Sequence, residues 1–131
     1  GTGPDKSGWS LELDQAYTDL NFTKYDGTTT TTKTSDWAPS TFTWYHIAVS
    51  RNGNDLRMFI DGDQIGSTHS VTGVDYDNQE DKIYIGQYHC CGGSVYYIDG
   101  YLDDIRVTKG VGRYTADFDP PGDPFLNQDC Q

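Results

Sequence analysis

Basic residues are scarce in this sequence. Nine lysines and arginines stand against twenty aspartates and glutamates, so the formal net charge at pH 7 is −11. A surface of this sign repels phosphate backbones and anionic lipid headgroups. We therefore expect no nucleic-acid binding, and we expect an extracellular or virion-surface location, which an acidic and lysine-poor surface fits.

Long apolar runs are also missing. No stretch approaches the length that is needed to span a bilayer, and no secretory signal peptide is recognisable. We therefore expect no membrane insertion. The chain begins abruptly at Gly1, which is consistent with a processed or truncated N-terminus.

Cysteine is limited to the vicinal pair Cys90 and Cys91 and to Cys130 near the end. No two of them have the C-x-x-C spacing of a zinc site, so zinc is not expected. One disulfide from the pair to Cys130 would leave one thiol over and would imply an oxidising environment. Three free thiols are an equally weighted alternative.

Aromatic residues and turn formers are what the sequence has in abundance. Aromatic residues make up 14% of the chain, with ten tyrosines and three tryptophans, although hydrophobic residues as a whole make up only 34%. Large rings at few positions favour a β architecture with a thin core and tyrosine-rich loops. The length of 131 residues suits one domain with a single core, so we expect residues 1–131 to form one domain.

Alternation of apolar and polar residues predicts a series of short strands. Asn52-Gly53 and Asp61-Gly62 predict two tight hairpin turns, and no segment shows a sustained helical period. Short strands separated by frequent turns predict an antiparallel sandwich. The strand patterns lie at residues 9–14, 20–23, 28–32, 44–49, 56–60, 64–67 and 83–86.

Residues 97–111 predict one buried strand with a β-bulge. The apolar residues before Asp103 have one parity (Ile98 and Leu102), and the next one after it, Ile105, has the other. Side chains of a strand alternate between its faces with period two. One extra residue near Asp103 is therefore needed to return the apolar side chains to one face.

The order and spacing of several motifs carry a family resemblance. Trp-Tyr-His-Ile-Ala-Val-Ser-Arg at 44–51 precedes Leu-Arg-Met-Phe-Ile-Asp-Gly at 56–62 and Ile-Tyr-Ile-Gly at 83–86. These motifs resemble the laminin-G-like, concanavalin A-like jelly-roll family. The closing segment, Gly-Tyr-Leu-Asp-Asp-Ile-Arg-Val-Thr-Lys-Gly-Val at 100–111 with Arg-Tyr-Thr, Phe and Pro-Pro at 113–121, resembles the branch common in phage virion and bacterial surface proteins.

The resemblance covers roughly residues 44–125 and implies an all-β fold, an antiparallel two-sheet jelly-roll sandwich. Members usually open with further strands, including an aromatic strand ahead of the one predicted at 9–14. We therefore expect this chain to lack some N-terminal strands of the usual fold. Either they belong to cleaved or additional sequence, or a partner chain supplies the missing sheet edge.

Catalysis is not expected. Glycosidases of this superfold carry Glu-x-Asp-x-x-Glu on one strand, and retaining hydrolysis needs two carboxyl groups about 5 Å apart. The two glutamates here are far apart in sequence, and we assign Asp99, Asp103 and Asp104 to turn and bulge positions. The three histidines have no nucleophile at a recognisable spacing. A glycoside-active enzyme is a distant alternative.

Oxygen ligands are concentrated in the acidic loop at 73–81. Calcium takes six to eight oxygens at about 2.3–2.6 Å, and the resemblance implies calcium at a loop rim. A solvated acidic loop is the alternative. The candidate ligands are Asp75, Asp77, Asn78, Glu80 and Asp81.

Aromatic residues in loops are candidates for a sugar platform, because the apolar faces of pyranose rings stack on aromatic rings. The candidates are Trp37, Tyr76, Tyr88 and Tyr96. Ordinary packing is the alternative for each of them.

Together these patterns predict a non-enzymatic surface module for adhesion or carbohydrate binding. It would belong to a phage virion, as a tail fibre or capsid decoration, or to a microbial surface protein. Its partners would be a surface glycan or other subunits of the assembly, including further copies of itself. The alternative is a purely structural component without a glycan ligand, whose aromatic surface is a subunit interface.

Overall fold

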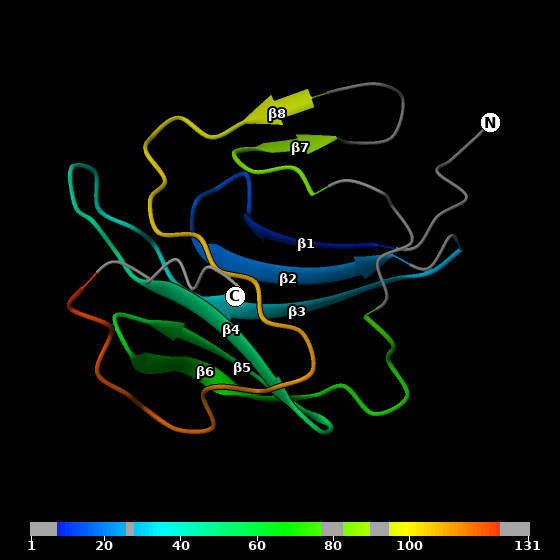
Figure 1. Cartoon of the computed structure of the whole chain (residues 1–131). Helices are drawn as coiled ribbons and strands as arrows, with labels where there is room; N and C mark the ends of the chain where they lie inside the picture. The colour runs from blue at the N-terminus through cyan, green and yellow to red at the C-terminus, as the bar shows by residue number, and fades with distance from the viewer. Residues whose placement is uncertain (1–7, 26–27, 77–82, 90–94, 124–131) are drawn as a thin grey trace, which may run out of the picture.

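The computed structural model describes residues 8–25, 28–76, 83–89 and 95–123. Over these residues the protein has two antiparallel three-stranded sheets, one two-stranded ribbon and no helix (Figure 1). The all-β, antiparallel class predicted from the sequence is therefore confirmed. None of the described segments forms a helix of the length and apolarity that crossing a membrane would require.

The first sheet contains β1 (Gly8–Leu13), β2 (Asp19–Tyr25) and β3 (Thr30–Asp36), in that spatial order. The turn between β1 and β2 is built on Asp14, whose carboxylate accepts hydrogen bonds from the backbone N–H of Thr18 at 2.7 Å and of Asp19 at 3.0 Å. These bonds stabilise the carboxylate form, the one from Thr18 most strongly, and lower the pKa of Asp14.

The second sheet contains β4 (Ile47–Asn52), β5 (Asp55–Ile60) and β6 (Asp63–Ser70), also in that order. Both predicted hairpins are confirmed. Gly53 has φ +59°, and Asp61 and Gly62 have φ 52° and 90°, the left-handed values that two-residue hairpin turns require. β6 is longer than the predicted strand at 64–67, and its register against β5 shifts between Leu56 and Met58.

The main core lies between the two three-stranded sheets. Side chains of β2, β5 and the segment after β6 are buried together there, and the hydroxyl of Ser35 on β3 lies 3.1 Å from Nε2 of His69 on β6. Ser35 is itself buried, so this bond links the two sheets at a position closed to water. The buried cluster consists of Leu20, Leu56, Met58, Ile60 and Val71.

A second cluster covers the opposite face of the β4–β5–β6 sheet. Phe59 alternates with Met58 along β5, so it faces away from the main core, yet it is fully buried. The rings of Tyr114 and Phe118 pack edge-on against it, with centroids 6.1 Å and 5.3 Å from its own. Tyr114 and Phe118 stack on each other at 3.6 Å.

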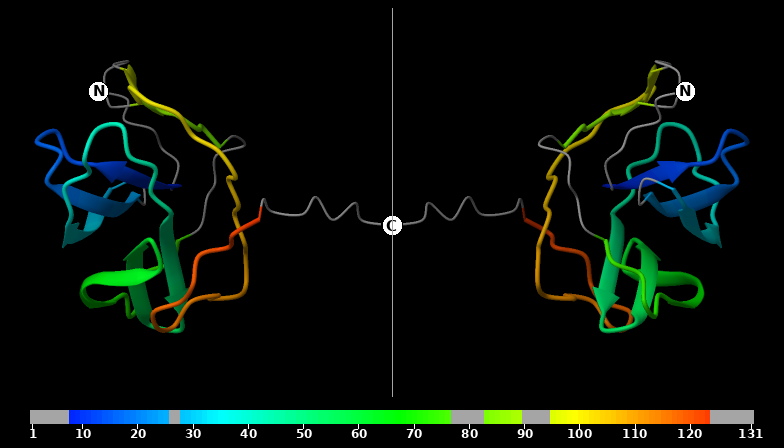
Figure 2. Two further views of the ribbon diagram at one scale, coloured as in Figure 1. Left: turned by 90° about the vertical axis from the view of Figure 1, so that its left-hand side faces the viewer. Right: turned by 90° about the vertical axis from the view of Figure 1, so that its right-hand side faces the viewer.

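The segment that carries these rings is tied to the sheet by hydrogen bonds. Tyr114 donates its backbone N–H to the hydroxyl of Ser50, and Phe118 donates to the Gly62 carbonyl, both at 3.0 Å. Figure 2 shows this segment, coloured orange, passing beside the β4–β6 sheet after the chain has come down from β8. The closing part of the chain therefore packs on the fold although it forms no strand between 98 and 123.

Two predicted strands are corrected by the structure. Residues 83–86 are not a strand, since β7 (Gln87–His89) begins after Gly86, whose φ is +74°. Of the predicted buried strand at 97–111, only Tyr97 belongs to a strand, as the last residue of β8 (Val95–Tyr97). A strand needs a neighbouring strand for its backbone groups, and apart from the bond that Ile98 donates to the Gly86 carbonyl, no described strand pairs with the rest of this segment.

The bulge predicted near Asp103 therefore has no ladder to interrupt. The backbone does change conformation there, because Asp104 has φ 48° and donates its N–H to the Asp103 carboxylate at 2.8 Å. The segment is also exposed rather than buried: Ile98, Leu102 and Ile105 are each about half exposed.

Candidate functional site

An open hollow lies between the first sheet, the β4 strand and the closing segment. Its walls include β1, β4, the loop at 37–46 and the stretches 83–87 and 96–114. Its volume is about 3780 Å³. Pockets for small ligands usually measure about 300–1,000 Å³, so this hollow is several times larger than one sugar-sized site.

The exposed apolar surface of the protein is concentrated in this hollow. All sixteen of the exposed large hydrophobic side chains among the described residues line it. Most come from the segments at 83–85 and 96–111. The sequence predicted a strand at 83–86 and a buried strand at 97–111. The most exposed tyrosines are Tyr101 and Tyr97, at 87% and 73%. The hollow is therefore an exposed apolar surface that no described segment covers, and such surfaces are typical of binding sites.

Trp37 contributes to packing rather than standing free. It follows β3 directly, its backbone N–H donates to the Thr18 carbonyl at 2.9 Å, and its side chain packs against the main core. The ring of Tyr45 meets it edge-on with centroids 5.1 Å apart. One side of Trp37 still borders the hollow.

Tyr76 lies between an aromatic ring and a cation. Its ring centroid is 5.1 Å from that of Phe22, and the Arg51 guanidinium carbon is 5.3 Å from its ring centroid. Burial raises the pKa of the Tyr76 phenol, and its hydroxyl is buried without a hydrogen-bond partner among the described residues. The ring is thus held firmly at the edge of the hollow.

Tyr88 and Tyr96 are brought together by the two-stranded ribbon. Their Cα atoms are directly opposite in the register of β7 and β8. The side chain of Tyr96 is half exposed and borders the hollow. The four aromatic candidates therefore form two separate groups: Trp37 and Tyr76 on the core side, and the Tyr88–Tyr96 pair on the ribbon.

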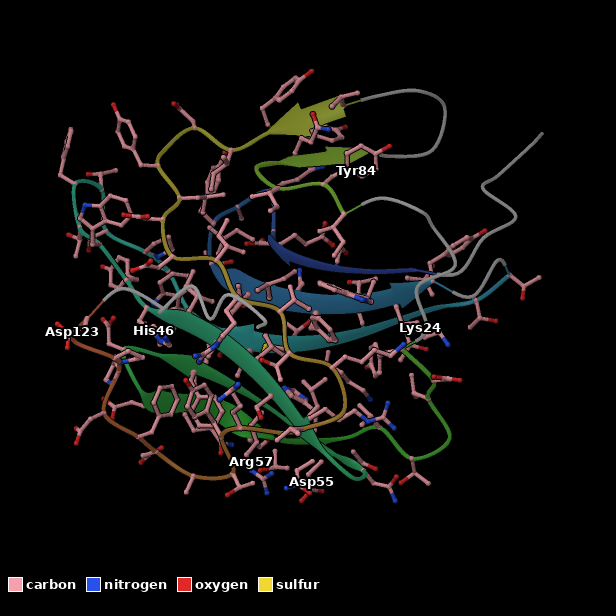
Figure 3. All side chains as sticks on the ribbon, viewed as in Figure 1. Lys24, His46, Asp55, Arg57, Tyr84 and Asp123 are labelled. Atoms are coloured by element: carbon pink, nitrogen blue, oxygen red, sulfur yellow. The ribbon has the colours of Figure 1, made fainter. Side chains whose placement is uncertain are left out.

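Sequence reasoning missed the most exposed aromatic residues. Tyr97 and Tyr101 were assigned to a buried strand, and Phe42 and Trp44 lie in the loop before β4, where both are exposed at the hollow. What leaves Tyr101, Phe42 and Trp44 exposed is that no described strand pairs with the segments at 98–111 and 37–46. Figure 3 shows Tyr84, a further exposed aromatic residue, just ahead of β7.

Of the five predicted calcium ligands, only Asp75 falls in a described segment; Asp77, Asn78, Glu80 and Asp81 lie outside the described residues. The Asp75 side chain is exposed, and a carboxylate of this kind is an oxygen donor that suits calcium. The Arg51 guanidinium lies over the neighbouring Tyr76 ring and brings a positive charge close to the same loop. Among described residues no group of three or more histidine, cysteine or acidic side chains is arranged to hold a metal ion.

The three cysteines, Cys90, Cys91 and Cys130, all lie outside the described residues. Their pairing therefore stays a prediction.

His46 precedes β4 and packs against the closing segment (Figure 3). Its ring meets that of Phe118 edge-on with centroids 5.6 Å apart, and its Nδ1 is buried without a partner among the described residues. Its backbone N–H donates to the carboxylate of Asp61 at 2.7 Å, which fixes the start of the strand. This environment is one of packing and turn formation.

Comparison with known proteins identifies the family. No curated protein and no solved structure matches the chain. A laminin-G-like family model, described as the concanavalin A-like lectin/glucanases superfamily, matches residues 1–111. The match covers most of the chain and agrees with the antiparallel sheets described above, so this chain belongs to the concanavalin A-like lectin/glucanases superfamily as a laminin-G-like domain.

Proposed function

We propose that this domain is a non-enzymatic adhesion module that binds carbohydrate at the rim of its sandwich, on an extracellular or virion surface. The observation that carries the proposal is the set of exposed tyrosines along the rim of the hollow, led by Tyr97 and Tyr101. Asp99 lies between them in the chain, within reach of the same surface. Aromatic faces with nearby carboxylates are the usual means of holding a pyranose ring and its hydroxyls.

A glycan array on the isolated chain tests the proposal, followed by titration of the best ligand against two variants. Tyr101→Ala removes the most exposed rim tyrosine. It should weaken binding at least about tenfold if a pyranose ring of the glycan stacks on this side chain. Tyr17→Ala is the comparison variant, because Tyr17 is also an exposed tyrosine that borders the hollow but belongs to the β1–β2 turn rather than to the rim formed by Tyr97 and Tyr101; it should weaken binding less. Absence of binding to every glycan, with and without calcium, would refute the proposal.

Calcium is part of this proposal, with Asp75 as the first of the predicted ligands. Binding only to the native state must raise its stability, by RT ln(1 + [L]/Kd). We expect a higher melting temperature in millimolar calcium than in chelator, and we expect Asp75→Asn to reduce the difference. An unchanged melting temperature would exclude the calcium site.

The second candidate function is that of a structural subunit in a larger virion or surface assembly. It is favoured by a different observation, namely that all sixteen exposed large hydrophobic side chains among the described residues border one hollow. An apolar surface of this extent usually marks a protein interface. A map of the intact particle or surface assembly tests this candidate, since it should place the hollow at a contact between subunits.

A further inference from the structure

The hollow is too large and too apolar to be explained by an oligosaccharide alone. Its volume of about 3780 Å³ is several times that of a small-ligand pocket, and its walls carry every exposed large hydrophobic side chain of the described residues. Large exposed apolar surfaces of this kind are typical of contacts with polypeptide. The inference below rests on the second candidate function and names the kind of partner that fills the hollow.

The backbone of β4 indicates which kind of structure the partner adopts. Asp61 donates its N–H to the His46 carbonyl, which makes His46 and Asp61 a hydrogen-bonded pair. Because such pairs alternate along an antiparallel ladder, the even-numbered residues of β4 form the hydrogen-bonded pairs with β5. The N–H and C=O groups of Ile47 and Val49 therefore point away from β5. β4 is an edge strand in the described sheet, and its residues line the hollow.

The open part of this edge is limited on one side. Gly112 passes so close to the Arg51 carbonyl that a Cβ on Gly112 would collide with it. The closing segment thus covers the edge at Arg51, while the Ile47 and Val49 positions remain bordered by the hollow. A backbone edge of this length that no described segment covers is suited to accept a short strand by β-augmentation.

The closing segment forms the opposite wall and contains no strand between 98 and 123. Backbone bonds hold it near its two ends, where Ile98 donates to the Gly86 carbonyl and Phe118 to the Gly62 carbonyl. Between them no residue belongs to a strand, and Leu102, Ile105 and Val107 are each about half exposed at the hollow. An inserted strand would bury these side chains under its apolar face.

Charge distinguishes the partner from a second copy of this chain. The formal net charge is −11, so two copies repel each other. The side chains that line the hollow include seven acidic and four basic ones, a balance that favours a neutral or basic segment. The edge position of β4 in its sheet and the acidic lining of the hollow thus both favour a neutral or basic strand as the occupant.

We propose that the hollow receives a β-strand from a polypeptide segment outside residues 1–131. The strand is extended, apolar at alternate positions and neutral to basic overall. It adds to the outer edge of β4 at Ile47 and Val49, and its apolar face packs against the closing segment. In this way the added strand extends the three-stranded β4–β5–β6 sheet and completes the sandwich.

Selection from a library of random ten-residue peptides displayed on phage tests the proposal, with the 131-residue chain as bait. The expected result is enrichment of sequences with apolar residues at alternate positions and few acidic residues. A synthetic version of an enriched peptide is then compared with a permuted peptide of the same composition, in which the apolar residues form one block. The permuted peptide should bind at least about tenfold more weakly, because only period-two alternation presents them to one wall.

Two variants of the chain separate backbone pairing from side-chain contact. Ile47→Pro removes an outward N–H without breaking the β4–β5 ladder, and Ile47→Ala keeps that N–H. The proline variant should weaken binding about fivefold more than the alanine variant, which is the loss of about one hydrogen bond. Should Ile47→Pro prevent folding, a peptide N-methylated at alternate residues makes the same test from the other side. Thr32→Ala is the control variant, because Thr32 pairs with β2 in the other sheet and does not line the hollow. It should leave peptide binding unchanged.

The outcomes also separate this inference from the function on which it rests. If no peptide is enriched and the chain instead forms dimers through the hollow, the strand is refuted and the assembly role stands. If no peptide is enriched and the chain is monomeric without binding to apolar dyes, both are refuted. Equal binding of the alternating and permuted peptides would refute the strand alone.

Discussion

Phe59 offers the sharpest test of how the closing segment is held. Its side chain is fully buried although it faces away from the main core, because the rings of Tyr114 and Phe118 cover it. Truncation of a buried phenylalanine to alanine costs about 3–5 kcal/mol. We expect Phe59→Ala to lower the free energy of unfolding by this amount, which is a large part of the usual stability of a small domain.

The pairing itself is measured by a double-mutant cycle between Phe59→Ala and Phe118→Ala. The two ring centroids are 5.3 Å apart at an interplanar angle of 68°, an edge-to-face geometry. Such pairs contribute about 0.5–1.5 kcal/mol beyond the buried area. The double variant should therefore lose less stability than the sum of the single variants by about that amount, measured by urea denaturation.

Met58 provides the matched control for this cycle. It neighbours Phe59 on β5 but belongs to the main core on the other face of the sheet. A cycle between Met58→Ala and Phe118→Ala should be additive within about 0.3–0.5 kcal/mol. Additivity in the Phe59 cycle as well would refute the claim that the closing segment packs against this ring.

Three further changes test the turns and the pH dependence. Gly62→Ala should lower the melting temperature more than Gly53→Ala, because both residues have positive φ but only at Gly62 would a Cβ collide with the Phe118 carbonyl. Burial lowers the pKa of His69 from 6.5, so the fold is favoured by the neutral imidazole and loses stability as the pH falls below 6.5. In melting curves recorded over a pH series, His69→Gln should reduce this loss of melting temperature at low pH. Burial raises the pKa of Glu12 from 4.5, so the ionised carboxylate lowers the stability of the fold as the pH rises above 4.5. Glu12→Gln should therefore raise the melting temperature at pH 7 and leave it unchanged near pH 3.5.

The local parts of the fold could be predicted from the sequence because their signals are local. Asn-Gly and Asp-Gly pairs favour positive φ, and a hairpin formed at each place. The second turns at Asp61 and Gly62 as predicted, whereas the first turns one residue later, at Gly53 and Asn54, because Asn52 pairs with Asp55. The alternation at residues 9–14 and 20–23 likewise corresponds to β1 and β2, which pair directly. Each of these elements finds its partner within the next few residues of the chain.

The strands predicted at 83–86 and 97–111 failed for a physical reason. Their apolar patterns are those of buried strands, but burial requires a neighbour that is not close in sequence. An alternating apolar pattern indicates that one face of a segment favours burial, but it does not show that a neighbouring strand is present to bury that face. The same error hid Tyr97 and Tyr101, which were placed inside a sheet and are among the most exposed side chains of the described chain.

The candidate site was predictable by residue type and not by position. Aromatic candidates near loops were identified, but Trp37 and Tyr76 pack on the core side, because rings next to a thin core are recruited into it. The hollow itself has no sequence signal, since it is defined by three segments that are distant in the chain.

Amide hydrogen exchange along β4, resolved by NMR, tests the central claim most directly. In the chain alone, the amides of Ala48 and Ser50 should exchange slowly because they bond to β5, and those of Ile47 and Val49 should exchange fast because they face the hollow. Addition of an alternating peptide should slow Ile47 and Val49 selectively. Slow exchange at Ile47 and Val49 in the chain alone would contradict the account, because the edge of β4 would then already be paired.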